Sequence, residues 1–219
     1  MHVPSRDTLR RELPQHLTPT VCTWLDEQLE APSLLAERKK LHLAFARLAR
    51  KLASAAERPI ALEGTTLPVP LIDLTRALLL LTALEAIPPA DHEAVIAELY
   101  RTGDLREQQS ILRALPALPE PARFVSVAVA ACRTNSPAVF AAIANDNPLP
   151  AAHFPELNFN QLVLKAIFMG VPVTRIDGLA TRRTPELRRM VTEYANERRA
   201  AGRTVPSDVD HVLELTSAP

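Results

Sequence analysis

Apolar residues recur along this chain at intervals of three and four positions, and prolines interrupt the pattern repeatedly. This spacing gathers apolar side chains on one face of an α-helix, so it predicts helices rather than strands. Several prolines stand near the start of a periodic segment, where the missing backbone N–H costs nothing. The predicted helices occupy residues 17–29, 33–53, 71–87, 90–101, 104–115, 121–133, 137–144, 159–169, 185–201 and 207–215.

Three short helices predicted between Gly103 and Pro148 follow each other at intervals of roughly sixteen residues. None of them is long enough to be stable alone, so each must pack against its neighbours. We therefore expect an all-α fold, an α-α helical repeat stack that resembles a short HEAT or armadillo array. A globular helical bundle is the alternative.

The chain has 219 residues, 47% of them hydrophobic, which is enough to bury one full core. We predict a single all-helical domain over residues 1–219. A long irregular connection is expected at residues 57–69, where Gly64 stands between prolines. It would separate an N-terminal helical hairpin, residues 1–58, from a helical stack, residues 70–219.

Glycine is scarce, with 5 Gly against 20 Pro. Hairpin turns, phosphate-binding loops, dinucleotide fingerprints and the nucleophile elbow all need glycine at fixed positions. The composition therefore argues against these site classes and agrees with helices separated by proline. We predict no cofactor.

The charge is balanced at 25 basic and 25 acidic residues, and aromatic residues make up 4% of the chain. Such a chain has no global field to attract nucleic acid or an anionic membrane, and few aromatic platforms for stacking bases. The basic helix predicted at residues 33–53 is interpreted as a solvated face or a protein contact. We predict that nucleic acid is not a partner.

The N-terminal residues lack the apolar core of a secretory signal, and the longest apolar run, residues 77–87, is too short to span a bilayer. Cys22 and Cys132 stand far apart among apolar neighbours and form no Cys-x-x-Cys pair. That pattern is typical of buried thiols in a reducing compartment. These features predict a cytoplasmic protein with no transmembrane segment.

Two histidines stand near acidic residues in arrangements that metal sites use. His92-Glu93 begins like the helix of a zinc protease, but Ile96 occupies the position of the second ligand. Asp208 and His211 lie three residues apart at an acidic helix end, which is more often exposed than a site. We predict no metal site and no catalytic residue.

The helix predicted at residues 159–169 is apolar on nearly every side, yet it carries Asn160, Gln161 and Lys165. Polar groups in a buried helix need partners. In the structural interpretation, Asn158 caps the helix, Asn160 bonds carbonyls of the preceding loop, and Lys165 reaches an acid or water. In the functional interpretation, Gln161 and Lys165 face a pocket for an anionic or polyhydroxylated ligand.

Helical geometry places Arg198 in the apolar arc of the helix predicted at residues 185–201. A charge in that position must be paired. An ion pair with Glu156, Asp177 or Glu193 is the structural interpretation, and binding of a ligand's phosphate or carboxylate is the functional one.

These side chains and their polar neighbours form one candidate ligand site in the last third of the chain. Its members are His153, Glu156, Asn160, Gln161, Lys165, Arg182, Glu197 and Arg198.

Short motifs in the same order along the last third of the chain indicate a family. They are Asn147-Pro148, His153-Phe154-Pro155-Glu156, Phe159-Asn160-Gln161, Leu164-Lys165-Ala166, Gly170-Val171-Pro172, Gly178-Leu179, Arg182, Tyr194-Ala195-Asn196-Glu197-Arg198 and Ala200-Ala201-Gly202-Arg203. With these motifs the sequence resembles the EboA-like family. The resemblance implies a helical protein of bacterial operons for secondary metabolism, whose companions look like a prenyltransferase, barrel-fold enzymes and a cyclase. It implies no established activity.

We therefore interpret the chain as a non-catalytic helical accessory or scaffold protein of a bacterial secondary-metabolite (ebo-type) operon, working beside pathway enzymes in the cytoplasm. Those enzymes are the expected protein partners. The alternative is an enzyme or a small-molecule-binding protein with a pocket near Lys165 and Arg198. A deep pocket with both side chains pointing inward would favour the alternative, whereas a filled core beneath a flat apolar surface would favour the scaffold.

Overall fold

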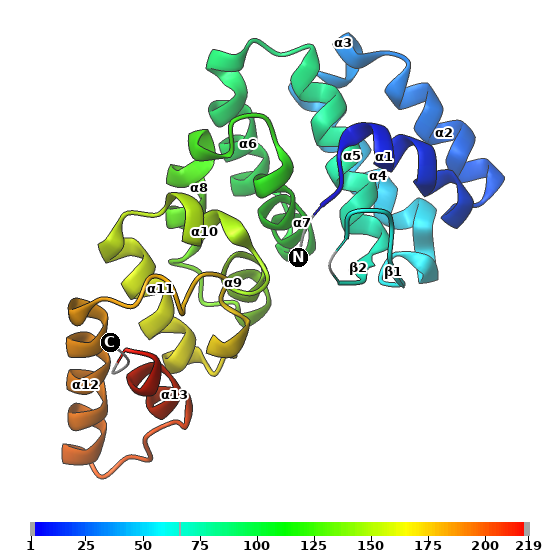
Figure 1. Ribbon diagram of the computed structural model, residues 1–219. Coiled ribbons are helices and arrows are strands. Elements are labelled where there is room, and N and C mark those ends of the chain that lie inside the picture. Colours follow the sequence, from blue (N-terminus) through cyan, green and yellow to red (C-terminus); the bar gives the residue numbers. More distant parts are fainter. Residues whose placement is uncertain (1–2, 66, 217–219) are drawn as a thin grey trace. The chain divides into compact units, whose positions relative to one another are not determined.

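Helices dominate the structure. The computed structural model describes residues 3–65 and 67–216, and within these ranges the only strands form a short antiparallel ribbon, β1 (Pro59–Ile60) with β2 (Val69–Pro70) (Figure 1). The α-helices are α1 (Arg6–Glu12), α2 (Pro19–Leu29), α3 (Pro32–Leu35), α4 (Arg38–Leu52), α5 (Leu71–Glu85), α6 (His92–Thr102), α7 (Leu105–Ala114), α8 (Val125–Ala131), α9 (Pro137–Ala144), α10 (Pro148–His153), α11 (Glu156–Met169), α12 (Pro185–Ala200) and α13 (Asp208–Leu215). The 3₁₀-helices are η1 (Leu13–His16), η2 (Ala53–Ala55), η3 (Pro89–Asp91), η4 (Leu115–Ala117), η5 (Pro121–Phe124) and η6 (Val173–Arg175). The predicted all-α fold is confirmed.

The chain divides into two compact units, Met1–Ala128 (unit 1) and Val129–Pro219 (unit 2). Unit 1 is built around α5, which contacts α1, α2, α3, α4 and α7 (Figure 1). Every residue of α5 except its last, Glu85, is buried. A helix that is apolar on nearly all sides needs such a position, because it has no face to give to water. Asp73 and Arg76 are carried into the interior with it.

The irregular connection expected at residues 57–69 contains the β-ribbon. Two backbone hydrogen bonds tie it to the start of α5, from Leu71 N to the Arg58 carbonyl and from Ile72 N to the Ala56 carbonyl. Thr66 in this segment lies outside the described residues.

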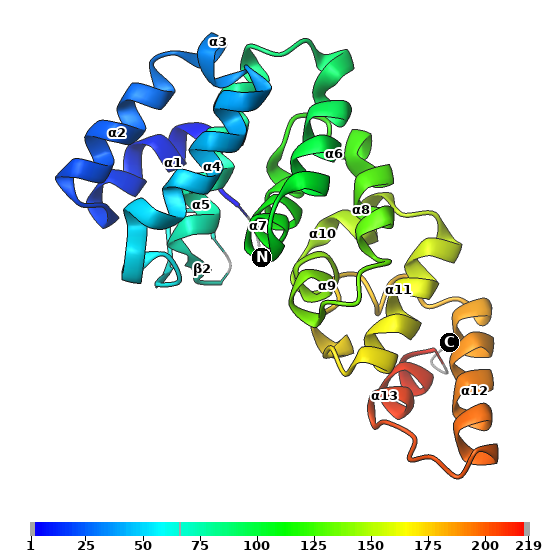
Figure 2. The same ribbon diagram turned by 180° about the vertical axis from the view of Figure 1, so that it is seen from behind.

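Unit 2 places α11 between α9 and α12, and α12 contacts α13 (Figure 2). Three of its helices, α9, α10 and α12, begin at a capping side chain, and α9 and α12 begin at the predicted residues. Ser136, Asn147 and Thr184 each accept a backbone N–H of the first turn through the side chain, and a proline follows each of them. Gly170, with φ +68°, ends α11 in the left-handed conformation that favours glycine.

Parts of the predicted helix pattern are wrong. Residues 33–53 form two helices, α3 and α4, because the backbone is extended at Glu37. Residues 121–133 begin as a 3₁₀ turn, and α1 and α10 lie where no helix was predicted. α10 accommodates both Pro148 and Pro150 because the first turn of a helix leaves its N–H groups without intrahelical partners.

Candidate functional site

Arg182 holds the end of α10. Its Nη1 donates to the carbonyls of Pro150 (2.8 Å) and Ala151 (3.2 Å), and its Nη2 donates to the carbonyl of Phe154 (2.8 Å). The guanidinium carbon also lies 4.4 Å from the centroid of the Phe159 ring. The last carbonyls of a helix lack intrahelical donors and carry the negative end of the helix dipole, so a cation is well placed there, although the Pro150 carbonyl also accepts the Phe154 N–H. Arg182 is therefore engaged within the fold.

The turn that precedes Arg182 packs closely against α10. Gly178 has φ +73°, and a Cβ built on it would lie 2.6 Å from the Cβ of Ala151. A side chain at this position would meet both an unfavourable backbone conformation and an occupied space. Glycine therefore permits the approach that brings Arg182 to the α10 carbonyls.

Asn160 is fully buried and links α11 to α12. Its Nδ2 donates to the Thr184 hydroxyl at 3.3 Å, and the same oxygen accepts the backbone N–H of Leu187 at 3.1 Å to cap α12. The prediction that Asn160 bonds loop carbonyls is wrong. The expected loop is the helix α10, and Arg182 donates to the carbonyls at its end. The expected cap at Asn158 is also wrong, since α11 begins earlier, at Glu156.

Lys165 binds backbone carbonyls rather than the acid or water expected in the structural interpretation. Its Nζ donates to the carbonyls of Cys132 (2.6 Å) and Thr134 (2.7 Å), just beyond the C-terminal end of α8. The ammonium lies 5.5 Å from the centroid of the Phe140 ring. An ammonium has three protons, so one donor remains beyond these two bonds.

Lys165 and Gln161 also line a pocket in unit 2, as the functional interpretation requires. Its volume is about 230 Å³, and its walls include Arg133, Phe154, Asn158, Gln161, Leu162 and Lys165. The three polar residues of α11 in this lining, at positions 158, 161 and 165, are spaced to share one helix face. Arg133 is exposed and makes no ion pair among the described residues. The pocket therefore presents a cation, two amides and the remaining Lys165 donor above an apolar wall.

Cys132 lies in the wall of the same pocket. Burial raises the pKa of its thiol to about 12, although the nearby Lys165 charge acts in the opposite direction. The thiol is therefore protonated at neutral pH. Because the thiolate is the nucleophilic form of cysteine, Cys132 is poorly suited to covalent chemistry in this state.

Arg198 and Glu197 line a different hollow of about 230 Å³, with Phe168, Tyr194, Ala201 and Arg203. The predicted buried ion pair of Arg198 is wrong. Arg198 is half-buried, its Nε donates to the carbonyl of Thr204 at 2.8 Å, and its guanidinium lies over the Tyr194 ring. The long side chain leaves the apolar arc and follows the helix end towards solvent. Lys165 and Arg198 thus line separate hollows.

His153 and Glu156 are exposed, and neither is among the residues that line these two hollows. Of the eight residues predicted for one site, Gln161 and Lys165 line the first of these pockets. Glu197 and Arg198 share the second hollow, while Asn160 and Arg182 join α10, α11 and the start of α12.

Unit 1 contains a buried polar cluster that no sequence motif predicts. Its centre is Asp73, whose side chain is 1% exposed. Oδ1 accepts from Arg106 Nη1 (2.7 Å) and Ser110 Oγ (2.6 Å), and Oδ2 accepts from Arg113 Nη1 (2.6 Å). These bonds join α5 to α7. The available signal is a pair of opposite charges, Asp73 and Arg76, three residues apart in an otherwise apolar run.

Arg76 is the second charged member of this cluster and is equally buried. It donates to the Ser110 hydroxyl (3.0 Å) and to the carbonyls of Arg106 and Phe45 (3.2 Å each), and it lies 3.6 Å from the Glu107 carboxylate. Burial lowers the pKa of the guanidinium, and the charge of Glu107 opposes that effect. The cluster connects α4, α5 and α7.

The histidine that begins α6 also has a structural partner. His92 is buried, with Nε2 at 3.0 Å from the Leu84 carbonyl and 2.9 Å from the Ile87 carbonyl, near the end of α5. Within residues 3–65 and 67–216, no group of three or more His, Cys, Asp or Glu side chains is arranged to hold a metal ion. None of the helices in these ranges combines the length and apolar character needed to cross a membrane.

Comparison with known families gives one match. A family model described as metabolite traffic protein EboA matches residues 5–214 of the chain. No curated protein and no solved structure matches it.

Proposed function

Because the chain belongs to the EboA family of metabolite traffic proteins, we propose that it is a non-catalytic accessory protein that holds a small polar metabolite for the enzymes of its pathway. The proposal includes the bacterial secondary-metabolite operon that the family resemblance implies and the cytoplasm that the sequence features predict. Its binding site is the unit 2 pocket lined by Arg133, Gln161 and Lys165.

The observation that carries this proposal is the combination of polar groups in that pocket. Arg133 supplies a cation without an ion pair among the described residues, and Gln161 is exposed at the pocket wall. Amides bind hydroxyl groups, and a guanidinium binds carboxylate or phosphate, often through two parallel hydrogen bonds. A volume of about 230 Å³ lies below the usual range of drug-sized ligand pockets. An anionic or polyhydroxylated metabolite of modest size fits this chemistry.

Binding without reaction is supported by the state of the two most reactive groups beside the pocket. Cys132 holds its proton, because burial raises its pKa to about 12. Lys165 is fixed by two carbonyls and acts as a donor to them. A protonated thiol and a bound ammonium favour retention of a ligand over nucleophilic or general-base attack on it.

The test uses the full chain and defined probes. Calorimetric titration with glucose 6-phosphate, glucose and inorganic phosphate separates the contributions of anion and hydroxyl groups. Arg133→Gln should weaken glucose 6-phosphate binding by about tenfold, the equivalent of one charge-assisted hydrogen bond. Arg203→Gln removes the same charge from the other hollow of unit 2 and should leave binding unchanged.

Metabolites that copurify with the native chain provide the second measurement. Mass spectrometry should find a bound metabolite on the wild type and on Arg203→Gln, and much less on Arg133→Gln. Equal retention by both variants would exclude this pocket. Chemical conversion of the bound metabolite by the purified chain would refute the non-catalytic role.

A scaffold role towards pathway enzymes is the second candidate, and exposed apolar side chains on α11 favour it. Phe168 is 70% exposed and Leu157 is 57% exposed. Large exposed apolar side chains often mark protein contacts. Loss of copurifying pathway proteins in Phe168→Ser, with metabolite retention intact, would assign the partner contact to this helix.

The repeat stack and the single domain stay proposals at the level of architecture. Short successive helices from α7 to α9 support the repeat stack, since each needs its neighbours for stability.

Trp24 is the only tryptophan and lies in unit 1. If residues 1–219 unfold as one domain, its fluorescence and the far-ultraviolet circular dichroism of the whole chain should change at the same urea concentration.

A further inference from the structure

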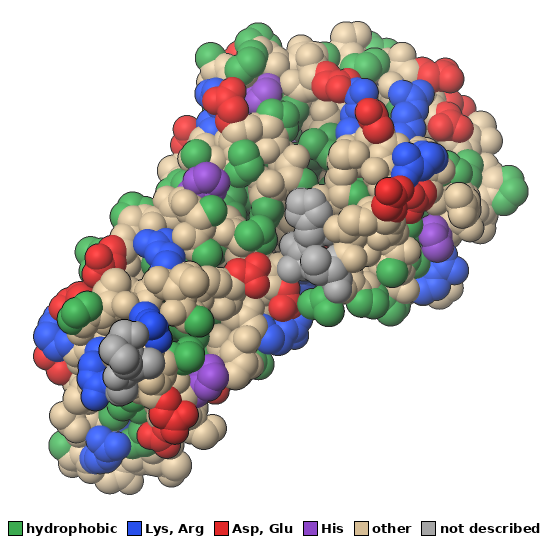
Figure 3. Space-filling model, in the orientation of Figure 1, with side chains coloured by type: hydrophobic (Ala, Val, Ile, Leu, Met, Phe, Trp, Pro, Cys, Tyr) green, Lys and Arg blue, Asp and Glu red, His purple; other side chains and the backbone are tan. Residues whose placement is uncertain are grey.

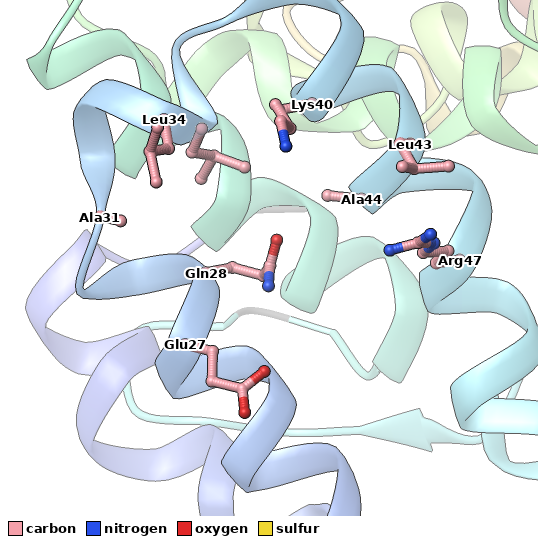
Figure 4. Close-up of a pocket in the computed structure, with 9 residues that line it drawn as sticks. Glu27, Gln28, Ala31, Leu34, Lys40, Leu43, Ala44 and Arg47 are labelled. Atoms are coloured by element: carbon pink, nitrogen blue, oxygen red, sulfur yellow. The ribbon is translucent and has the colours of Figure 1, made fainter.

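Unit 1 contains a hollow of its own, formed by α2, α3 and α4. Its volume is about 230 Å³, and its walls include Glu27, Gln28, Leu34, Lys40, Leu43 and Arg47. The three helices contact one another, and α4 faces the viewer in Figure 2. Figure 4 shows Lys40 and Arg47 extending from α4 towards the space into which Gln28 and Glu27 project from α2. The hollow is therefore lined by polar groups on two facing helices.

The electrostatics of the hollow favour an anion. Lys40 and Arg47 lie seven residues apart on one face of α4. Both are exposed, and neither makes an ion pair among the described residues, whereas Arg38 on the same helix pairs with Glu98. Glu27 is the acid in the lining, so the two cations leave a net positive charge.

The chain as a whole has no excess of either sign, whereas α4 is a basic helix that also carries Arg38, Lys39, Arg50 and Lys51. Figure 3, drawn in the orientation of Figure 1, shows basic and acidic side chains interspersed on the face opposite to the one seen in Figure 2. Among the basic residues of α4, Lys40 and Arg47 are the two that line the hollow.

Apolar side chains complete the lining. Leu34 is 53% exposed and Leu43 is 41% exposed, and the buried Leu35 and Ala44 lie beneath them. A ligand carrying only an anion would leave this leucine surface in water. A ligand that combines an anion with an apolar group would cover it and gain roughly 25 cal/mol for each Å² removed from water.

We propose that this hollow binds a small anionic amphiphile, with a carboxylate or phosphate held between Lys40 and Arg47 and an apolar group packed on Leu34 and Leu43. A volume of about 230 Å³ limits the ligand to a short chain or a small ring system. The site is separate in sequence and in lining from the unit 2 pocket, and the proposal does not depend on that pocket.

The experiment titrates the full chain with octyl phosphate, octanol and inorganic phosphate by calorimetry. Octyl phosphate should bind more tightly than either of the other two, because only it satisfies both the cations and the leucines. Lys40→Gln and Arg47→Gln should each weaken octyl phosphate binding by about tenfold. Leu34→Asn should weaken octyl phosphate binding while leaving inorganic phosphate binding unchanged.

Arg50→Gln is the matched control, since Arg50 is an exposed arginine of α4 outside the lining of the hollow. It should leave the affinity within about twofold of the wild type, because an exposed charge beyond the site is screened by salt. Leu34, Lys40, Arg47 and Arg50 are all exposed, so the thermal melts of the variants should match that of the wild type.

Three results would overturn the proposal. Equal weakening by Arg50→Gln and Arg47→Gln would show general attraction to a basic helix. Equal affinity for octanol and octyl phosphate would show that the cations contribute nothing. Cosedimentation with anionic phospholipid vesicles, in the absence of binding to monomeric octyl phosphate, would assign the surface to a membrane instead of a small ligand.

Discussion

Replacing Asp73 by alanine is the sharpest test of how unit 1 is held together. The carboxylate is 1% exposed and accepts hydrogen bonds from Arg106, Ser110 and Arg113. Two of its donors are guanidinium groups, so Asp73→Ala removes the negative charge between them. The substitution also takes a favourable charge away from Arg76, which is itself 1% exposed.

The expected cost follows from what each donor keeps. Arg106 keeps its ion pair with Glu57 at 2.6 Å, and its side chain is 23% exposed. Ser110 can still donate to the Arg106 carbonyl at 3.1 Å. Arg113, 22% exposed, has no second acceptor among the interactions resolved for it. Breaking a buried ion pair on one side costs roughly 3–5 kcal/mol, so we expect the free energy of unfolding to fall by that amount.

Urea unfolding and thermal melting measure the change. For a chain of this length, a loss of 1 kcal/mol lowers the melting temperature by about 2–4 °C, so Asp73→Ala should lower it by roughly 6–20 °C. Asp26→Ala is the control, since Asp26 is an exposed acid on α2 and its loss should change the free energy by no more than about 0.5 kcal/mol.

A double-mutant cycle with Arg113→Ala isolates the pairwise contribution. The combined variant should be less destabilised than the sum of the two single variants, by about 1–3 kcal/mol, because the second substitution removes a charge that the first left unpaired. Additive effects, or a loss below about 1 kcal/mol for Asp73→Ala alone, would refute the buried ion pair.

Three further predictions follow from unit 2. Burial raises the pKa of Cys132 to about 12 from 9.0, so the thiol stabilises the folded chain fully below pH 9, and that contribution is lost as the pH rises towards 12. In a Cys22→Ser background, iodoacetamide at pH 9 should alkylate native Cys132 at least ~100-fold more slowly than the urea-unfolded chain; equal rates would contradict the burial. Arg182→Met removes three hydrogen bonds to carbonyls and should lower the free energy of unfolding, measured by urea titration, by about 2–4 kcal/mol. Arg182→Lys should recover only part of this loss, because an ammonium lacks the planar fork of a guanidinium. Full recovery by lysine would contradict the fork geometry. Arg198→Met should cost less than about 1 kcal/mol, because the side chain is half-buried and binds one carbonyl; a fall in melting temperature as large as that of Asp73→Ala would contradict this.

Local signals in the sequence predict much of the helical pattern. Ser136 and Thr184 followed by proline begin helices where expected, and Gly170 ends one, because caps depend on residues adjacent in the chain. The sequence does not predict α10, because two prolines so close together are typical of a loop. Arg182, which stabilises the end of α10, lies about thirty residues away in the sequence.

The candidate site is predictable only where it depends on one helix. Gln161 and Lys165 face the same pocket because the spacing within α11 fixes their relative direction. The prediction of a buried ion pair for Arg198 is wrong because a helical wheel gives only the direction of the Cα–Cβ bond. A long side chain at a helix end can turn towards solvent. Arg133, which makes no ion pair among the described residues, comes from another segment, so only the tertiary fold places it in the pocket.

The enclosure of α5 sets an order for folding during synthesis. The ribosome releases α1 to α4 before α5, but α7, which completes the cover and supplies the arginines around Asp73, follows by about thirty residues. At about 5–20 residues per second, the nascent chain carries a partly covered apolar helix and an unpaired carboxylate for on the order of seconds. A product that terminates before Leu105 would retain this exposed helix permanently and become a substrate for chaperones and proteases rather than a smaller stable unit.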